Sequence, residues 1–288
     1  MAVVTDRDVA ALAASAAPPR ARRGPAQALR AWNATWPKLL AIALVILGWQ
    51  TLVWVHFRPE YLVPSPFTVL DHLYHEPGTM LTASLVTLKR GLYGFLLAIV
   101  IGTVVGIGVA RVKVLRAAIG SMITGLQTMP SVAWVPLAII LFKEGQGTVT
   151  FVVVIGAAPS IANGIINGID HVPPLLLRAG RVLGARGFSA LYHVVIPAAL
   201  PSVVGGLKQG WAFAWRSLMA AELIGGLNGK LGIGQLLNGR QTQADYVGVF
   251  EVMIVILIIG ILVDSLLFGT MDRAIRRRYG LVDAATTG

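Results

Sequence analysis

Six long apolar runs alternate with polar or Gly- and Pro-rich stretches along the chain. They cover residues 39–56, 91–110, 117–142, 148–168, 199–221 and 247–269. Each is close to the ~20 residues that a helix needs to cross ~30 Å of hydrocarbon. None shows the two-residue alternation of a membrane β-strand, and only helices or closed barrels satisfy the backbone in lipid. The pattern predicts an all-α integral membrane protein with about six transmembrane helices. Pro and Gly interrupt the third and fourth runs, so the pattern does not define where these two helices begin and end.

Composition supports this class. The chain is 56% hydrophobic and only 13% charged, whereas a soluble domain carries about 25% charged residues. Cysteine is absent, which excludes disulfides and thiolate metal sites. The net charge of +11 could indicate nucleic-acid binding, but the positions of the basic residues favour membrane orientation and no nucleic-acid partner.

The basic residues predict the topology. With the N-terminus inside, 16 of the 24 Lys and Arg residues fall on cytoplasmic segments. This bias predicts that both termini and the loop 169–198 are cytoplasmic. We expect a basic cytoplasmic tail over residues 1–38, disordered to about Ala31. An uncleaved first span follows, then a transmembrane domain to residue 269 and a basic cytoplasmic tail over 270–288.

The loop 169–198 is unusually long for a connector between two spans. It reads Arg178-Ala-Gly-Arg-Val-Leu-Gly184, then nine further residues, then Val194-Val-Ile-Pro197. Its Gly and Pro signals predict two short helices at an angle. The alternative is an amphipathic connector lying on the lipid headgroups.

The spacing in this loop resembles the EAA loop of ABC-importer permeases, which docks into the ATPase subunit. Ala179, Gly184 and Pro197 fall in register with the pattern Glu-Ala-Ala, three residues, Gly, nine residues, Ile, one residue, Leu-Pro. Four positions depart from it, in that Arg178 replaces the Glu, Gly180 the second Ala, Val194 the Ile and Ile196 the Leu. The resemblance, together with the small and apolar side chains, assigns ATPase coupling to Ala179, Gly180, Gly184, Ala185, Arg186, Phe188, Leu191 and Pro197.

Three further stretches resemble permeases for aliphatic sulfonates, taurine and nitrate. They are Gln127–Ile140, Pro197–Pro201, and Ala220–Ile224 with Gly232–Leu237. The resemblance covers roughly residues 37–280 and implies the permease fold of a type I ABC importer in a bacterial cell membrane. Such permeases work as a pair, with two ATPase subunits and an extracytoplasmic solute-binding protein. The chain has no phosphate-binding loop, so ATP and Mg belong to the partner ATPase, and no cofactor or enzyme activity is expected here.

For the translocation path we expect Met129, Pro130, Trp134, Arg216, Ser217 and Glu222. Arg216 lies about 17 residues into the fifth run, roughly 26 Å from its inner edge. A charge at such depth normally faces a cavity or a partner, and a guanidinium can pair with two oxygens of a sulfonate. The alternative is that Arg216 snorkels to the outer headgroups and Glu222 ends the helix. Lys208 lies nearer the midplane, with its direction open.

Two further features, and the function itself, have more than one interpretation. His72, His75 and Glu76 have metal-like spacing but lie beside Pro77 and Gly78, which favours a solvated outer loop and no metal site. Gly205, Gly206 and Gly210 predict close approach of two copies along the fifth span. A self-sufficient secondary transporter or channel is the competing function. A membrane enzyme lacks a convergent catalytic set. The resemblance implies that the path carries a small organic or inorganic anion, with an aliphatic sulfonate-type solute favoured, and it leaves the individual solute open.

Overall fold

The computed structural model describes residues 25–225 and 229–279, which are helical almost throughout. The chain divides into two compact units, Met1–Arg58 and Pro59–Gly288. The first unit contains α2 (Pro25–Trp54), whose apolar part Thr35–Trp54 is long enough to cross a membrane. Helix α2 thus begins at Pro25, inside the segment predicted to be disordered to about Ala31, whereas residues 1–24 of the predicted tail lie outside the described residues. Proline suits a first helical turn, since its missing N–H would have no partner there.

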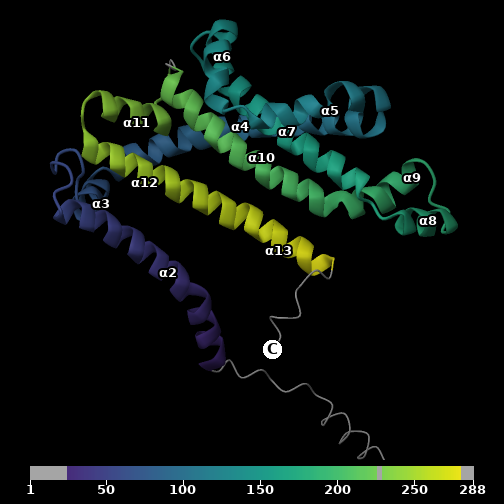
Figure 1. Cartoon of the computed structure of the whole chain (residues 1–288), viewed down its shortest axis with the longest axis horizontal. Helices are drawn as coiled ribbons and strands as arrows, with labels where there is room; N and C mark the ends of the chain where they lie inside the picture. Colours follow the sequence, from purple (N-terminus) through teal and green to yellow (C-terminus); the bar gives the residue numbers. More distant parts are fainter. Residues whose placement is uncertain (1–24, 226–228, 280–288) are drawn as a thin grey trace, which may run out of the picture. The chain divides into compact units, whose positions relative to one another are not determined.

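The second unit holds the remaining helices (Figure 1). Five helical stretches of the described chain can span a membrane, or six if one bent pair counts as a span. The prediction of about six is thus confirmed, with the third run as the irregular one. The helices are α3 (Pro66–His75), α4 (Pro77–Arg111), α5 (Lys113–Thr128), α6 (Val135–Phe142), α7 (Gln146–Asp170), α8 (Pro174–Val182), α9 (Phe188–Ala190), α10 (Ile196–Ile224), α11 (Ile233–Thr242), α12 (Tyr246–Val263) and α13 (Gly269–Arg278).

The segment before the second span is a helix and not the predicted solvated loop. Ser65 caps α3, its side chain accepting a hydrogen bond from the Thr68 amide at 3.2 Å. Pro66 then occupies the first turn of α3, and Pro77 does the same for α4. Because α4 starts at Pro77, the second span is 35 residues long and begins well before residue 91.

The third run breaks in the middle. Helix α5 ends at Thr128, Met129 and Pro130 are extended, and a 3₁₀ turn over Ser131–Trp134 leads into α6. The two halves are bent by 109°. Pro130 lacks an amide hydrogen and disfavours helical backbone at Met129, which explains the break.

Helix α7 is the centre of the second unit, with α4 and α10 packed along it (Figure 1). Small residues allow this close packing. A Cβ on Gly164 of α7 would lie 2.6 Å from the Cα of Gly206 of α10, and one on Gly102 of α4 would lie 2.8 Å from the Ala158 carbonyl oxygen. The three helices therefore pack closely as one group, and the loop after α7 follows at its end.

Candidate functional site

The predicted coupling segment folds as two short helices around a turn. Helix α8 ends at Val182, and after the turn α9 runs through a π-helical stretch, Leu191–Val195, into α10. Gly184 has φ +85° and Gly187 φ +54°. Such backbone strongly favours glycine, so these two residues set the direction of the turn.

Within this segment the predicted coupling residues divide into inward and outward groups. A Cβ on Gly180 would lie 2.8 Å from Val194 Cγ2, so this glycine serves internal packing between α8 and the π-helical stretch. Leu191 is half-buried and lines a cavity of about 770 Å³ together with the more exposed Phe188 and residues of α4, α7 and α10. Ala185 is half-buried, whereas Ala179, Gly184 and Arg186 are exposed.

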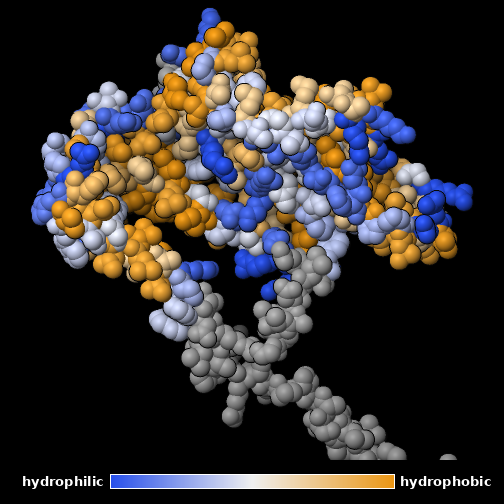
Figure 2. All heavy atoms as spheres, viewed as in Figure 1, coloured by the Kyte–Doolittle hydropathy of each residue, from blue (hydrophilic) through white to orange (hydrophobic). Residues whose placement is uncertain are grey.

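The outer side of the segment is strongly apolar. Leu175, Val182, Leu183 and Phe188 are 74%, 87%, 86% and 81% exposed. Figure 2 shows apolar and strongly hydrophilic residues side by side at the α8–α9 end. Exposed apolar surface rimmed by charge is typical of a protein- or membrane-binding surface. Sequence reasoning singled out Phe188 but missed the other three, which the amphipathic spacing of α8 could have revealed.

Two contacts brace the ends of this segment. The Arg116 guanidinium donates a hydrogen bond to Asp170 Oδ1 at 2.8 Å, tying the start of α5 to the last residue of α7. At the other end, the Tyr279 hydroxyl donates to the carbonyl oxygen of Pro197 at 2.6 Å. Pro197, predicted as part of the coupling site, is therefore a contact point for the C-terminal segment.

Helix α10 carries an uncovered polar stripe. Ser202, Gly205, Gln209 and Arg216 are exposed, and Ala212 is half-buried between the last two. Their spacing of three and four residues places all five on one helix face. Gln209 was missed by sequence reasoning, although this periodicity, read from Arg216 backward, would have indicated it. A polar stripe on a span normally faces a cavity or another protein rather than lipid.

The predicted path residues do not all reach open space. Met129 and Pro130 are exposed at the break of the third span, and Arg216 is exposed on the stripe. Trp134 is half-buried against the main apolar core.

Ser217 and Glu222 are enclosed within the protomer, at 0% and 1% exposure. A Cβ on Gly156 of α7 would clash with the Ser217 hydroxyl. Neither side chain therefore reaches the surface of the protomer in this conformation.

Glu222 is instead the centre of a buried polar cluster. Its carboxylate accepts hydrogen bonds from Thr87 Oγ1 at 2.8 Å, Arg90 Nη1 at 2.9 Å and the Gly234 amide at 3.0 Å. Arg90 also donates to the Lys230 carbonyl oxygen at 2.8 Å. The cluster joins α4, α10 and the start of α11. Arg216 is exposed on a different face of α10, and its guanidinium carbon lies 5.1 Å from the Phe213 ring centroid.

The glycines predicted for contact between copies are mostly used inside the chain. Gly206 packs on Gly164, and a Cβ on Gly210 would lie 2.8 Å from Ile161 Cγ1. Only Gly205 of the three faces open space. The expected glycine surface is therefore reduced to Gly205 and its neighbours on the stripe.

A second polar cluster lies where α3, α11 and α12 meet. The Arg240 guanidinium bonds Glu76 at 2.6 Å and Asp245 at 2.7 Å. Burial alone would raise the pKa of Asp245, but the Gly248 amide and Arg240 hold it below its ordinary value. His72 Nδ1 lies 2.9 Å from Glu251 Oε2. Among the described residues no group of three acidic, His or Cys side chains could hold a metal ion.

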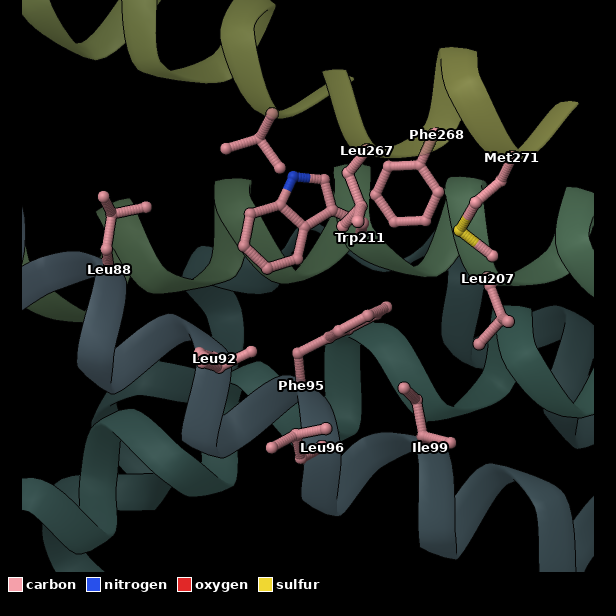
Figure 3. Close-up of a pocket in the computed structure, with 11 residues that line it drawn as sticks. Leu88, Leu92, Phe95, Leu96, Ile99, Leu207, Trp211, Leu267, Phe268 and Met271 are labelled. Carbon is pink, nitrogen blue, oxygen red and sulfur yellow. The ribbon is translucent and has the colours of Figure 1, made fainter. Parts of the chain in front are cut away.

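A separate cavity of about 400 Å³ lies between α4, α10 and the α12–α13 region (Figure 3). The ring of Phe95 faces those of Trp211 and Phe268, with centroids 5.2 and 6.5 Å away. Every lining residue is apolar, so the cavity offers no polar partner to a charged solute. The α10 stripe is the better candidate for a path.

Comparison with known proteins places this geometry in context. Residues 98–278 match the family described as binding-protein-dependent transport system inner membrane component. An ABC transporter permease protein of Methanocaldococcus jannaschii is 30% identical over 79% of this chain and 86% of its own length. The taurine transport system permease protein TauC of Escherichia coli is 26% identical over 82% and 86%, respectively. The nitrate import permease protein NrtB of Synechocystis is 28% identical over 85% and 91%.

A solved structure shares the fold. An inward-facing conformation of the MetNI methionine ABC transporter matches with a TM-score of 0.56 and 21% identity, over 69% of this chain and 98% of that chain. The described helices therefore have the architecture of an ABC-importer permease, as the spacing of the loop predicted.

Proposed function

Because the chain belongs to the family of binding-protein-dependent transport system inner membrane components, we propose that it forms the path of an ATP-driven importer for a small anion, with an aliphatic sulfonate as the first solute to test. It is a multi-pass membrane permease of importer type. Two ATPase subunits, an extracytoplasmic solute-binding protein and a second copy of the chain complete the proposed assembly. Both termini and the loop after α7 face the cytoplasm in this proposal.

The proposed path is assigned from the exposed stripe on α10. Its polar and small side chains are uncovered in the protomer, and Arg216 supplies a positive charge without an ion pair among the described residues. Facing stripes of two copies would enclose a polar channel. Taurine and nitrate, the solutes named for two relatives, are both small and carry an anionic group. This shared chemistry supports an anionic solute, and an aliphatic sulfonate is the more specific proposal within that class.

The segment 174–188 is the proposed ATPase contact. Its four exposed apolar side chains supply the desolvated anchors that protein interfaces use, and Arg178, Arg181 and Arg186 supply a charged rim. In the alternative, the segment lies on the lipid headgroups and buries the same apolar side chains in the membrane surface. Gly184→Glu separates the two, because a side chain at φ +85° is strained and adds a charge at the turn. Loss of ATPase co-purification with normal insertion supports docking.

The function is tested by reconstituting the permease with its ATPase and binding protein in vesicles. ATP-dependent uptake is measured for taurine, methanesulfonate, nitrate, bicarbonate and a neutral control such as dimethyl sulfone. We expect uptake of one of the anions only when both partners are present. Uptake that needs neither ATP nor the ATPase would establish the secondary-transporter alternative.

A further inference from the structure

A second charge pair lies at depth beside the α10 stripe. Lys208 Nζ is 3.5 Å from Asp264 Oδ1, the first residue of the π-helical turn Asp264–Phe268 between α12 and α13. Lys208 lies 12 residues beyond the start of α10 and Asp264 lies 14 before the end of α13. At 1.5 Å per residue, both are ~20 Å from these helix ends. A hydrocarbon layer of ~30 Å would therefore enclose both charges.

This pair is open, whereas the Arg90–Glu222 pair is closed. The side chains of Lys208 and Asp264 are 49% and 53% exposed, against 10% and 0% for Arg90 and Glu222. Half-exposed charges at this depth are costly if they face lipid. The exposed side of the pair must therefore meet water or another protein.

The position of Lys208 on α10 indicates where the exposed side of the pair lies. Lys208 precedes Gln209 of the stripe by one residue, about 100° around the helix. It also lies four residues before Ala212, about 40° around the helix, and so borders the stripe on the side of α10 that faces Asp264. Asp264 in turn lines a cavity of about 640 Å³ with residues of α10, α11 and α12. A π-helical turn starting at the acidic residue fits a functional site, where such turns are frequent.

We propose that Lys208 is an anion-binding site of the path and that Asp264 is its resting counter-ion, which the transported anion displaces. The inference rests on the proposed function only in taking the stripe as the path. Exchange of one carboxylate for another anion leaves the Lys208 ammonium paired throughout, and the displaced Asp264 carboxylate, whose side chain is 53% exposed, is solvated from the open side of the pair. It also allows release, because Asp264 competes for Lys208 once the anion has moved on, and conduction needs binding that is weak enough to leave.

The native absence of cysteine makes the electrostatics directly measurable. Gln209→Cys places one thiol beside the pair in each copy of the permease within the assembled importer, which is held in nanodiscs open to both faces, and labelling is read on the permease band. Modification rates are compared for anionic and cationic methanethiosulfonate reagents. Asp264→Asn should raise the anionic-to-cationic ratio at least about threefold, since one nearby negative charge is removed. Lys208→Gln should lower it by a similar factor, and the double variant should return it close to the parent.

Anion exchange is tested with methanesulfonate as the probe and dimethyl sulfone as its neutral match. Methanesulfonate should slow modification of the thiol, more strongly with Asp264→Asn and not at all with Lys208→Gln. The Lys208→Asp, Asp264→Lys double variant retains an ion pair and reports on folding. An unreactive thiol, or a ratio that neither variant changes, overturns the proposal. Failure of sulfonate uptake with normal thiol electrostatics would instead overturn the chosen solute and leave the Lys208 site standing.

Discussion

Arg90 and Glu222 form a 2.9 Å ion pair that joins two spans separated by 132 positions in the chain. Thr87 and the Gly234 amide complete the hydrogen bonding of the carboxylate. Removing one partner of a buried, fully hydrogen-bonded charge pair strongly destabilises the fold, because the remaining charge is left unpaired. The pair therefore holds α4, α10 and α11 together as one unit.

Glu222→Ala should destabilise the protein by about 3–5 kcal/mol, the range for removing one partner of a buried pair. The measurement is thermal unfolding of the purified permease in detergent. Glu144→Gln, at an exposed position, is the control and should leave the transition unchanged. A Glu222→Ala protein with native stability would show that Arg90 finds another partner.

The contact between α7 and α10 gives a matched glycine pair. A Cβ on Gly206 would lie 2.6 Å from the Cα of Gly164, whereas one on the adjacent Gly205 would meet nothing within 4 Å. Gly206→Ala should therefore destabilise by about 1–3 kcal/mol through overpacking, and Gly205→Ala should be neutral or slightly stabilising. Equal melting temperatures of the two variants would contradict the close contact.

Sequence patterns were sufficient for the class of fold and for the two short helices around Gly184, and insufficient for buried partners. Apolar runs and Gly/Pro spacing locate the spans and Gly184 because they act locally. The partner of Glu222 is Arg90, far away in sequence, and no local signal connects them. Likewise Gly206 could face another copy or another helix by sequence, and only packing on Gly164 decides it. The start of α4 was missed because a polar, amphipathic helix end does not register as an apolar run.

The exposed apolar end of α8 predicts a loss of ATPase binding. Val182→Ser combined with Leu183→Ser removes two anchors that are more than 80% exposed and should leave the fold intact. We expect at least about a tenfold loss in co-purified ATPase, as for interface anchors worth more than 1.4 kcal/mol. Tyr74→Ser, at an 82% exposed residue of α3, is the control on the opposite predicted side. Full ATPase recovery with the double variant would favour the lipid-surface alternative.

Asp245 predicts a stability change confined to low pH. Its folded-state pKa lies below its ordinary value, so its charged form contributes stability above about pH 4. That contribution is lost as the pH falls through the folded-state pKa. The difference in melting temperature between the native chain and Asp245→Asn should be constant from pH 8 to 5 and shrink below pH 4. The exposed Glu60→Gln should show no such dependence, and a difference that grows on acidification would contradict the assignment.

Arg216 predicts a selectivity that depends on its planar group as well as its charge. It is exposed on the stripe, and its nearest described partner is the ring of Phe213. A positive charge in the outer half of the membrane attracts an anion more strongly than it would in water. Lysine keeps that charge but loses the bidentate fork and part of the stacking, and glutamine loses the charge.

Anion uptake by the reconstituted importer should therefore fall in the order native, Arg216→Lys, Arg216→Gln. Uptake is measured at matched permease content, with ATPase co-purification as the check on assembly. Ser202→Ala, on the same stripe but uncharged, is the matched control and should cost less than Arg216→Gln. Equal and near-native uptake by both Arg216 variants would mean that the guanidinium reaches the outer headgroups, since a snorkelling charge contributes nothing to a solute in the path.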